Sequence, residues 1–156
     1  MKWTTTFVHP FIILMWMLTV FACTPRQQSA VMDRADSLMN TRPDSALTLL
    51  NTLLPDTDKM SERDLMRFHL LRTNAQNKCD TVFRAEHAAL MHRVCDYYDH
   101  ASKHEANDKM LAHYLLGRCY DDMGEAPAAL QEFHNAADAA DTTRVNTTRK
   151  EITLFD

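Results

Sequence analysis

Few side chains in this sequence have the type and spacing that catalysis or metal binding requires. His100 and His104 stand four residues apart, which places two imidazoles on one face of a helix. No third ligand at a suitable spacing completes a metal site, and we expect both histidines to flank a solvated loop. The motifs GxSxG and HExxH are absent, and the two glycines are too few for a phosphate-binding loop. We therefore expect no metal, no cofactor and no catalytic site.

The cysteines raise the question of disulfide bonds. Cys79, Cys95 and Cys119 follow Cys23 along the chain, and three thiols cannot all pair with one another. Cys95 and Cys119 belong to neighbouring antiparallel helices. Their positions along the helix axes differ, so we expect the two side chains not to meet. A bridge between Cys79 and Cys119 would join equivalent helices of adjacent hairpins. The competing expectation is that both are buried small hydrophobic residues, and the spacing leaves the two alternatives open.

Hydrophobic residues that recur every three to four positions indicate the elements that must position these side chains. The period is typical of amphipathic helices, and its breaks predict three helical hairpins, over residues 30–54, 61–100 and 107–141. With two glycines and five prolines, the composition also favours helices over sheets. We expect an all-α fold in which the antiparallel hairpins stack on one another.

Local signals place several helix ends. The first helix is expected over residues 30–39, after a polar tether at 24–29, and Pro55 ends the second helix at Leu54. Ser61, three residues before Asp64, resembles a capping box at the start of the third helix.

The third hairpin carries the most specific pattern in the chain. Leu116 and Gly117 are followed by Tyr120, and Ala129 is followed four residues later by Phe133. Gly117 supplies a small residue where two helices approach closely. These are the L-G-x₂-Y and A-x₃-F elements of the tetratricopeptide repeat (TPR).

Two further residues fit the same repeat. Gly124 ends the first helix of the hairpin, and Ala136 lies on the inner face of the second. Two positions depart from the consensus, because His113 replaces the usual Trp and Asp141 stands where Pro is common. Over residues 29–143 the chain resembles the lipid-anchored TPR proteins of Bacteroidota. The resemblance implies a short α-solenoid that binds a protein or peptide and has no catalytic activity.

The N-terminus indicates where the chain is located. Lys2 is followed by an uncharged, strongly apolar run that ends at Cys23. This pattern predicts a secretory signal peptide over residues 1–22. The residues Val20 to Cys23 resemble the lipobox of bacterial lipoproteins, which implies that Cys23 carries the lipid. An uncleaved anchor helix over residues 3–22 is the alternative. No acidic residues directly follow the cysteine, so we expect a lipoprotein that faces the periplasm rather than the cell surface. We expect it on the outer rather than the inner membrane.

One helix face in the third hairpin is a candidate for partner binding. At 100° per residue it lies opposite the apolar stripe, and an alignment of Ala75 with Gly117 adds two residues of the preceding hairpin. Such a wall would suit a peptide that carries carboxylates, and the alternative is an ordinary solvated face. The face comprises Leu111, Tyr114, Arg118 and Asp121, with Arg72 and Gln76 from the preceding hairpin.

Charge and the end of the chain complete the expectations. The 17 basic and 21 acidic side chains give a formal net charge of −4, and their interspersion disfavours nucleic acid as a partner.

Residues 142–156 are weakly apolar, so we expect a frayed or incomplete segment and self-association through this end. An alternative function is that of a sensory or ligand-binding fragment of a longer envelope signalling protein.

Overall fold

The computed structural model describes residues 25–102 and 105–152, with side chains described from 26 to 140 apart from the gap at 103–104. Within those residues the chain forms α-helices and one 3-10 segment and has no strand, so the expected all-α class is confirmed. The elements are α2 (Pro25–Leu38), α3 (Pro43–Asn51), η1 (Leu54–Lys59), α4 (Glu62–Lys78), α5 (Ala85–His100), α6 (Ala106–Asp122) and α7 (Ala126–Ile152).

The expected signal peptide and the lipid-bearing Cys23 lie outside the described residues. None of the described helices is both long and apolar enough to cross a bilayer.

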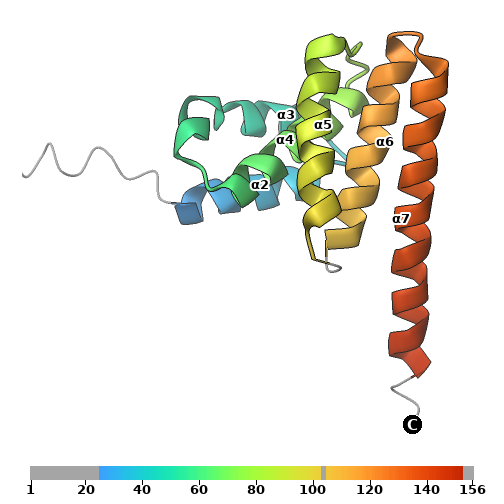
Figure 1. The fold of residues 1–156 in the computed structure, drawn as a ribbon. Helices are drawn as coiled ribbons and strands as arrows, with labels where there is room; N and C mark the ends of the chain where they lie inside the picture. Colours follow the sequence, from blue (N-terminus) through green and yellow to red (C-terminus); the bar gives the residue numbers. More distant parts are fainter. Residues whose placement is uncertain (1–24, 103–104, 153–156) are drawn as a thin grey trace, which may run out of the picture.

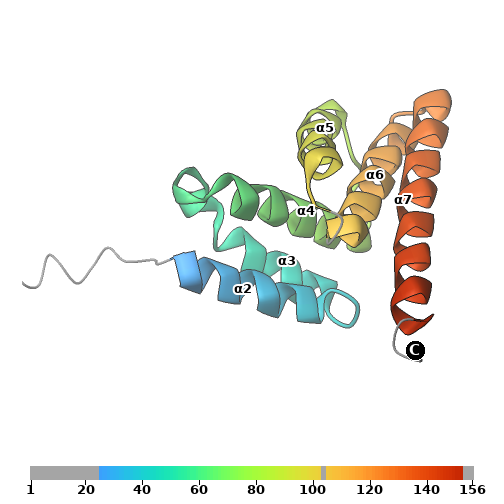
Figure 2. The same ribbon diagram turned by 60° about the horizontal axis from the view of Figure 1, so that its bottom comes forward.

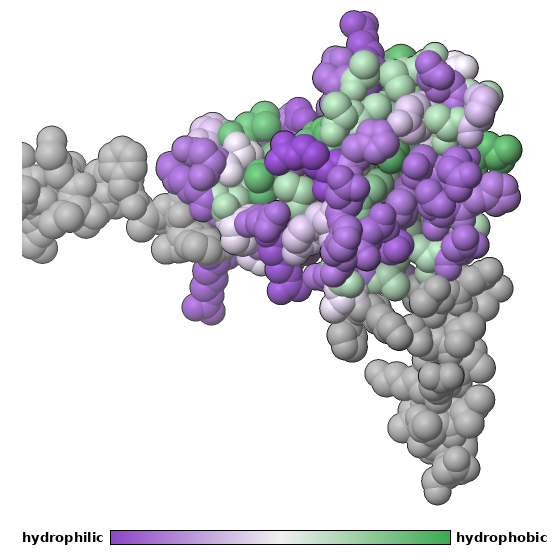
Figure 3. Space-filling model, in the orientation of Figure 1, coloured by the Kyte–Doolittle hydropathy of each residue, from purple (hydrophilic) through white to green (hydrophobic). Residues whose placement is uncertain are grey.

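The helices follow one another as three hairpins (Figures 1 and 2). Consecutive helices contact each other, and in addition α2 contacts α4 and α4 contacts α6. The pair α6 and α7 lies side by side over the length of α6 (Figure 1). On the face drawn in Figure 3, hydrophilic residues cover most of the described surface, with hydrophobic residues between them.

Two hydrophobic clusters form the core, and α4 contributes to both. The first core cluster lies between α2, α3 and α4, where Phe68 and Leu71 meet Met32 and Leu50. The second core cluster lies between α4, α5 and α6. Its buried members are Met66, Leu70, Phe83, Ala88, Met91, Val94, Cys95, Tyr98, Ala112, Leu115, Leu116 and Cys119.

The ends of the helices follow their local sequence. Ser61 Oγ accepts a hydrogen bond from the backbone N–H of Asp64 at 3.2 Å, as the capping pattern predicted. Gly124 has φ of 76° after α6, and Asp80 has φ of 55° after α4. The left-handed conformation ends both helices, and glycine adopts it without the steric cost of a Cβ.

Three expected boundaries differ from the structure. Helix α2 begins at Pro25 rather than at residue 30, so most of the expected polar tether is helical. Proline is favoured at a first helical position, and Gln28 is buried with 2% exposure. Helix α3 ends at Asn51, because Pro55 has no N–H that could bond to the carbonyl four residues earlier, and Leu54 belongs to η1.

The third boundary is at the other end of the chain. Helix α7 continues to Ile152, past the boundary expected at residue 141. No proline or glycine interrupts residues 128–156, so the backbone meets no strong helix breaker there.

Candidate functional site

The third hairpin is held together by a close approach of α6 to α7. A Cβ atom added at Gly117 would lie 2.6 Å from two ring carbons of Phe133. That distance is well inside van der Waals contact, so the ring occupies the space where any other residue would place its side chain. Leu116, Ala129 and Ala136 of the same hairpin are buried. The glycine therefore has the packing role that its place in the sequence pattern predicted.

The four α6 residues of the predicted partner-binding face do not form one open surface. Leu111 is partly buried against the second core cluster. Tyr114 is 40% exposed, and its ring centroid lies 6.1 Å from that of Phe133. Arg118 and Asp121 form an ion pair at 2.6 Å. The exposed part of this face therefore consists of the Tyr114 ring and the Arg118–Asp121 ion pair.

Arg118 joins α6 to the end of α4. Its guanidinium contacts Asp121 at 2.6 Å and Asp122 at 3.1 Å, and its Nε donates to Asn77 Oδ1 on α4 at 3.3 Å. Asp122 also accepts from the backbone N–H of Phe83 at 2.9 Å. Two carboxylates already neutralise the guanidinium, so the cluster fits a structural role better than capture of an acidic peptide.

The two α4 residues assigned to this face lie elsewhere. Arg72 Nε donates to Asn51 Oδ1 at the end of α3, at 2.9 Å. Gln76 Oε1 is buried and has no hydrogen-bond partner among the described residues.

The alignment of Ala75 with Gly117 caused this error. The backbone N–H of Thr81 bonds to Gln76, and that of Glu125 bonds to Tyr120, so the two helix ends are equivalent at these residues. Gln76 therefore corresponds to Tyr120 rather than to Arg118. A shift of two residues rotates a helix face by about 200°, which moves the predicted positions to the other side of α4.

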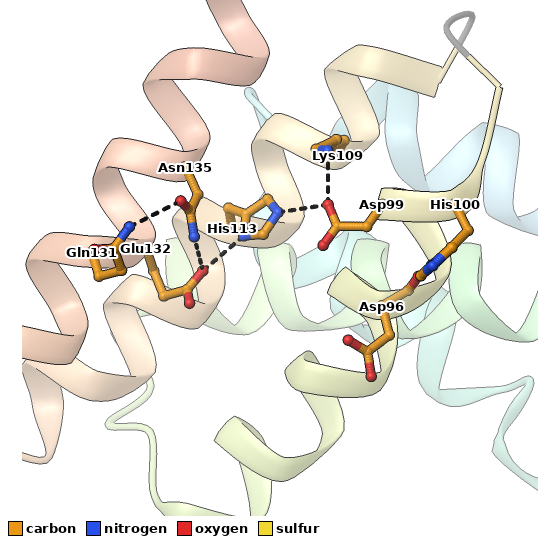
Figure 4. A network of polar contacts seen from close by, with 8 residues as sticks. All are labelled: Asp96, Asp99, His100, Lys109, His113, Gln131, Glu132 and Asn135. Atoms are coloured by element: carbon orange, nitrogen blue, oxygen red, sulfur yellow. Dashed lines mark hydrogen bonds and ion pairs between the residues drawn. The ribbon is translucent and has the colours of Figure 1, made fainter.

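A polar network at His113 was not anticipated from the sequence (Figure 4). His113 is buried on α6 with both ring nitrogens facing carboxylates. Its Nδ1 lies 2.7 Å from Glu132 Oε2 on α7, and its Nε2 lies 3.1 Å from Asp99 Oδ1 on α5. The network therefore joins three helices through one side chain.

Two more residues complete this histidine network. Lys109 forms an ion pair with Asp99 at 2.8 Å, and Asn135 donates to Glu132 at 3.3 Å. Partial burial of Asp99 opposes its ionisation, but hydrogen bonds from Lys109 and His113 outweigh it and hold the pKa of Asp99 below its usual range. The available sequence signal was the departure at His113 from the tetratricopeptide pattern that the third hairpin resembles, which has tryptophan there.

A cavity of about 530 Å³ adjoins the histidine network. It lies between the end of α5, the start of α6 and the middle of α7. Its polar lining offers both acceptors and donors to a small molecule. The lining residues are Tyr98, Asp99, Ala101, Ser102, Glu105, Ala106, Lys109, His113, Asn135, Asp138 and Ala139.

The described cysteines are free, so no bridge joins Cys79 to Cys119. Cys95 and Cys119 are buried in the second core cluster. Burial raises the pKa of Cys119 to about 12 and raises that of Cys95 further. Both thiols are therefore protonated and poorly reactive near neutral pH.

The histidine pair gives no metal site among the described residues. His100 Nδ1 lies 2.7 Å from the backbone oxygen of Asp96, and His104 lies outside the described residues. No group of three or more potential ligand side chains that could hold a metal ion occurs in the described part of the chain.

Comparisons with protein-family models, with curated proteins and with solved structures find no match for this chain. Over residues 25–102 and 105–152, the fold is all-helical and consists of three hairpins.

The Gly117 contact predicts a specific pattern of stabilities. Gly117→Leu should lower the free energy of unfolding by about 1–3 kcal/mol through overpacking against Phe133. Gly117→Ala should also destabilise, because its Cβ already overlaps the ring. In a Phe133→Leu background the alanine should cost little, since it gains about 1 kcal/mol of helix propensity. Urea midpoints of the parent, Gly117→Ala, Phe133→Leu and the double variant give the coupling. An equal cost of alanine in both backgrounds would contradict the contact.

The lowered pKa of Asp99 predicts an acid-sensitive contribution to stability. A carboxyl with a depressed folded-state pKa stabilises above its unfolded pKa and loses that effect as pH falls through the folded value. The free energy of unfolding should therefore fall between about pH 5 and about pH 2, and less steeply in Asp99→Asn. Urea titrations at several pH values measure this. Asp58→Asn, at an exposed position in η1, is the control, and identical slopes in both variants would exclude the effect.

Proposed function

We propose that this protein is a lipid-anchored, periplasmic interaction module of the TPR type, without catalytic activity. The observation that carries the proposal is the packing of helical hairpins in which the first helices, α2, α4 and α6, are neighbours in turn. Such an arrangement gives an extended surface on which a protein or peptide binds across several hairpins. The Gly117–Phe133 contact supports the repeat relationship, because it joins the two halves of the sequence motif.

Partner recognition on the α6 face is proposed to rest on aromatic contact. Tyr114 is the exposed aromatic residue there, at 40% exposure, and Leu130 on α7 is 59% exposed. Tyrosine contributes strongly to protein interfaces, since it buries a large apolar surface and keeps a polar end. Because Arg118 is neutralised by its own helix, it orients α4 against α6 instead of binding the partner. The end of the stack at α7 remains our proposed surface for self-association.

The anchor is proposed to be lipid on Cys23. Helix α2 begins at Pro25, so Thr24 alone would separate the modified residue from the helical domain. A short tether of this kind would hold α2 close to the membrane surface. We place the protein in the cell envelope, facing the periplasm, with the outer membrane as the proposed site.

A sensory or ligand-binding role is the second candidate function. The observation that favours it is the cavity of about 530 Å³ beside the histidine network. A small polar molecule in this cavity would contact α5, α6 and α7 together.

The anchoring proposal predicts the outcome of metabolic labelling. Cells that express the protein and are fed an alkyne fatty acid should label it, and Cys23→Ala should abolish both the label and the processed form. Cys79→Ala is the matched control and should label fully. Labelling of the Cys23 variant, or an unlabelled parent, would contradict lipidation of this residue.

The interaction proposal predicts position-specific crosslinking. A photoreactive phenylalanine analogue at Tyr114 should form a discrete crosslinked species in intact cells, because the partner covers the exposed ring. The same analogue at Ala89, an exposed position on α5, should not. Tyr114→Ala combined with a crosslinker at Leu130 would show whether the aromatic ring contributes affinity. An equal yield of crosslinked species at Tyr114 and at Ala89 would favour a solvated face.

A further inference from the structure

A buried tyrosine lines the cavity beside the histidine network. Tyr98, on α5, is 4% exposed and belongs to the second core cluster, and it also lines the cavity. Its hydroxyl forms no hydrogen bond with any residue that the structure describes. In that part of the chain, the fully enclosed side-chain oxygen without a partner belongs to Gln76, so the Tyr98 oxygen keeps access to the cavity. Buried tyrosine hydroxyls usually have a hydrogen-bond partner, and here a molecule in the cavity would supply one.

Carboxylates outnumber cations in the lining of this cavity. Three lining residues carry a carboxylate, and Lys109 carries an ammonium. The excess of negative charge remains even when His113 holds a second proton. A cleft lined mainly by one sign of charge attracts ions of the opposite sign. The three carboxylates are those of Asp99, Glu105 and Asp138.

Two of these carboxylates use one oxygen each for their contacts within the protein. Asp99 contacts both Lys109 and His113 through Oδ1 (Figure 4). Glu105 pairs with Arg63 through Oε1 at 3.3 Å, and the Arg63 side chain is 76% exposed, so water weakens this pair. A carboxylate accepts hydrogen bonds at both oxygens. The second oxygen of each therefore remains an acceptor for a ligand.

The Tyr98 hydroxyl lies in the same negative surroundings. Burial raises the pKa of Tyr98, and the charges of Asp108 and then Glu105 raise it further. The hydroxyl is therefore neutral near neutral pH, and its oxygen accepts hydrogen bonds. An anion would be disfavoured here, because Lys109 is already paired with Asp99 at 2.8 Å.

We propose that this cavity binds a small organic cation through a primary ammonium group. The ammonium donates charge-assisted hydrogen bonds to the Tyr98 hydroxyl and to the carboxylate oxygens of the lining. Three alanines of the lining, Ala101, Ala106 and Ala139, offer apolar contact to a short carbon chain. A volume of about 530 Å³ is in the usual range for small-molecule sites. The proposal rests on the ligand-binding function given above as the second candidate, and it names the class of ligand.

The test is a calorimetric titration of the protein, purified from membranes in detergent, at constant ionic strength. The probes are the diamine putrescine, the uncharged diol of the same chain length, and succinate as an anion of similar size. We expect saturable binding of putrescine and none of the other two. Because the diamine and the diol have nearly the same shape, the difference between them isolates the ammonium groups.

Variants of two neighbouring tyrosines test the hydroxyl. Tyr98→Phe keeps the ring in the core and removes the hydroxyl, so the affinity for putrescine should fall about tenfold, as for the loss of a hydrogen bond to a charged group. Tyr97→Phe is the matched control, because Tyr97 does not line this cavity, and it should bind as the parent does. Thermal unfolding confirms that each variant is folded. Undiminished affinity in Tyr98→Phe, or an equal loss in Tyr97→Phe, would overturn the proposal.

Lys109→Gln tests the sign of the ligand's charge. The change removes an ammonium that competes for Asp99, so putrescine should bind about two- to fivefold more tightly. An anion would instead bind more weakly, because it loses the one cationic group of the lining besides His113. Binding of succinate or the diol in place of putrescine would overturn the cation and leave the ligand-binding function standing. If none of the three probes binds, both are overturned.

Discussion

The two-sided burial of α4 is the constraint on which the rest of the structure depends. Phe68, Leu71 and Ala75 enter the first core cluster, whereas Met66 and Leu70 enter the second. A helix that faces two cores has only narrow strips left for polar side chains. Those strips carry Arg67, which pairs with α2, and His69 and Arg72. The need to bury two faces therefore decides which polar residues of α4 meet which neighbour.

The third hairpin is held by a different combination of forces. In the part of α7 whose side chains are described, residues 126–140, alanine occupies the buried positions, and each alanine buries little apolar area. These positions are Ala129, Ala136 and Ala139. The close approach of α6 to α7 at Gly117 offsets this small buried area, because it brings the Phe133 ring into dense van der Waals contact with α6. The buried His113 then adds directional contacts to α5 and α7. Compared with a large apolar side chain at this position, the histidine exchanges buried apolar area for polar contacts that join three helices.

The sequence predicted the features that depend on short stretches of chain. The all-α class, the cap at Ser61, the helix-ending Gly124 and the close approach at Gly117 follow from local spacing and conformational preference. The start of α2 was missed although Pro25 is a favoured first helical residue. The extent of α7 was missed because no strong breaker marks its end. The histidine network and the position of Arg72 were missed for another reason. Both depend on the rotation of one helix relative to another, and a two-residue error in alignment reverses a helix face.

Arg118 and Arg72 show why residue type alone does not reveal a binding site. Both are partly exposed arginines near the end of the first helix of a hairpin, and both contact an asparagine of a neighbouring helix. Arg118 has aspartates three and four residues further along its own helix, which neutralise it. Arg72 is followed at those positions by Ala75 and Gln76, which carry no charge. The local supply of carboxylates therefore decides whether the guanidinium is neutralised within its own helix, whereas both arginines join their helix to a neighbour through an asparagine.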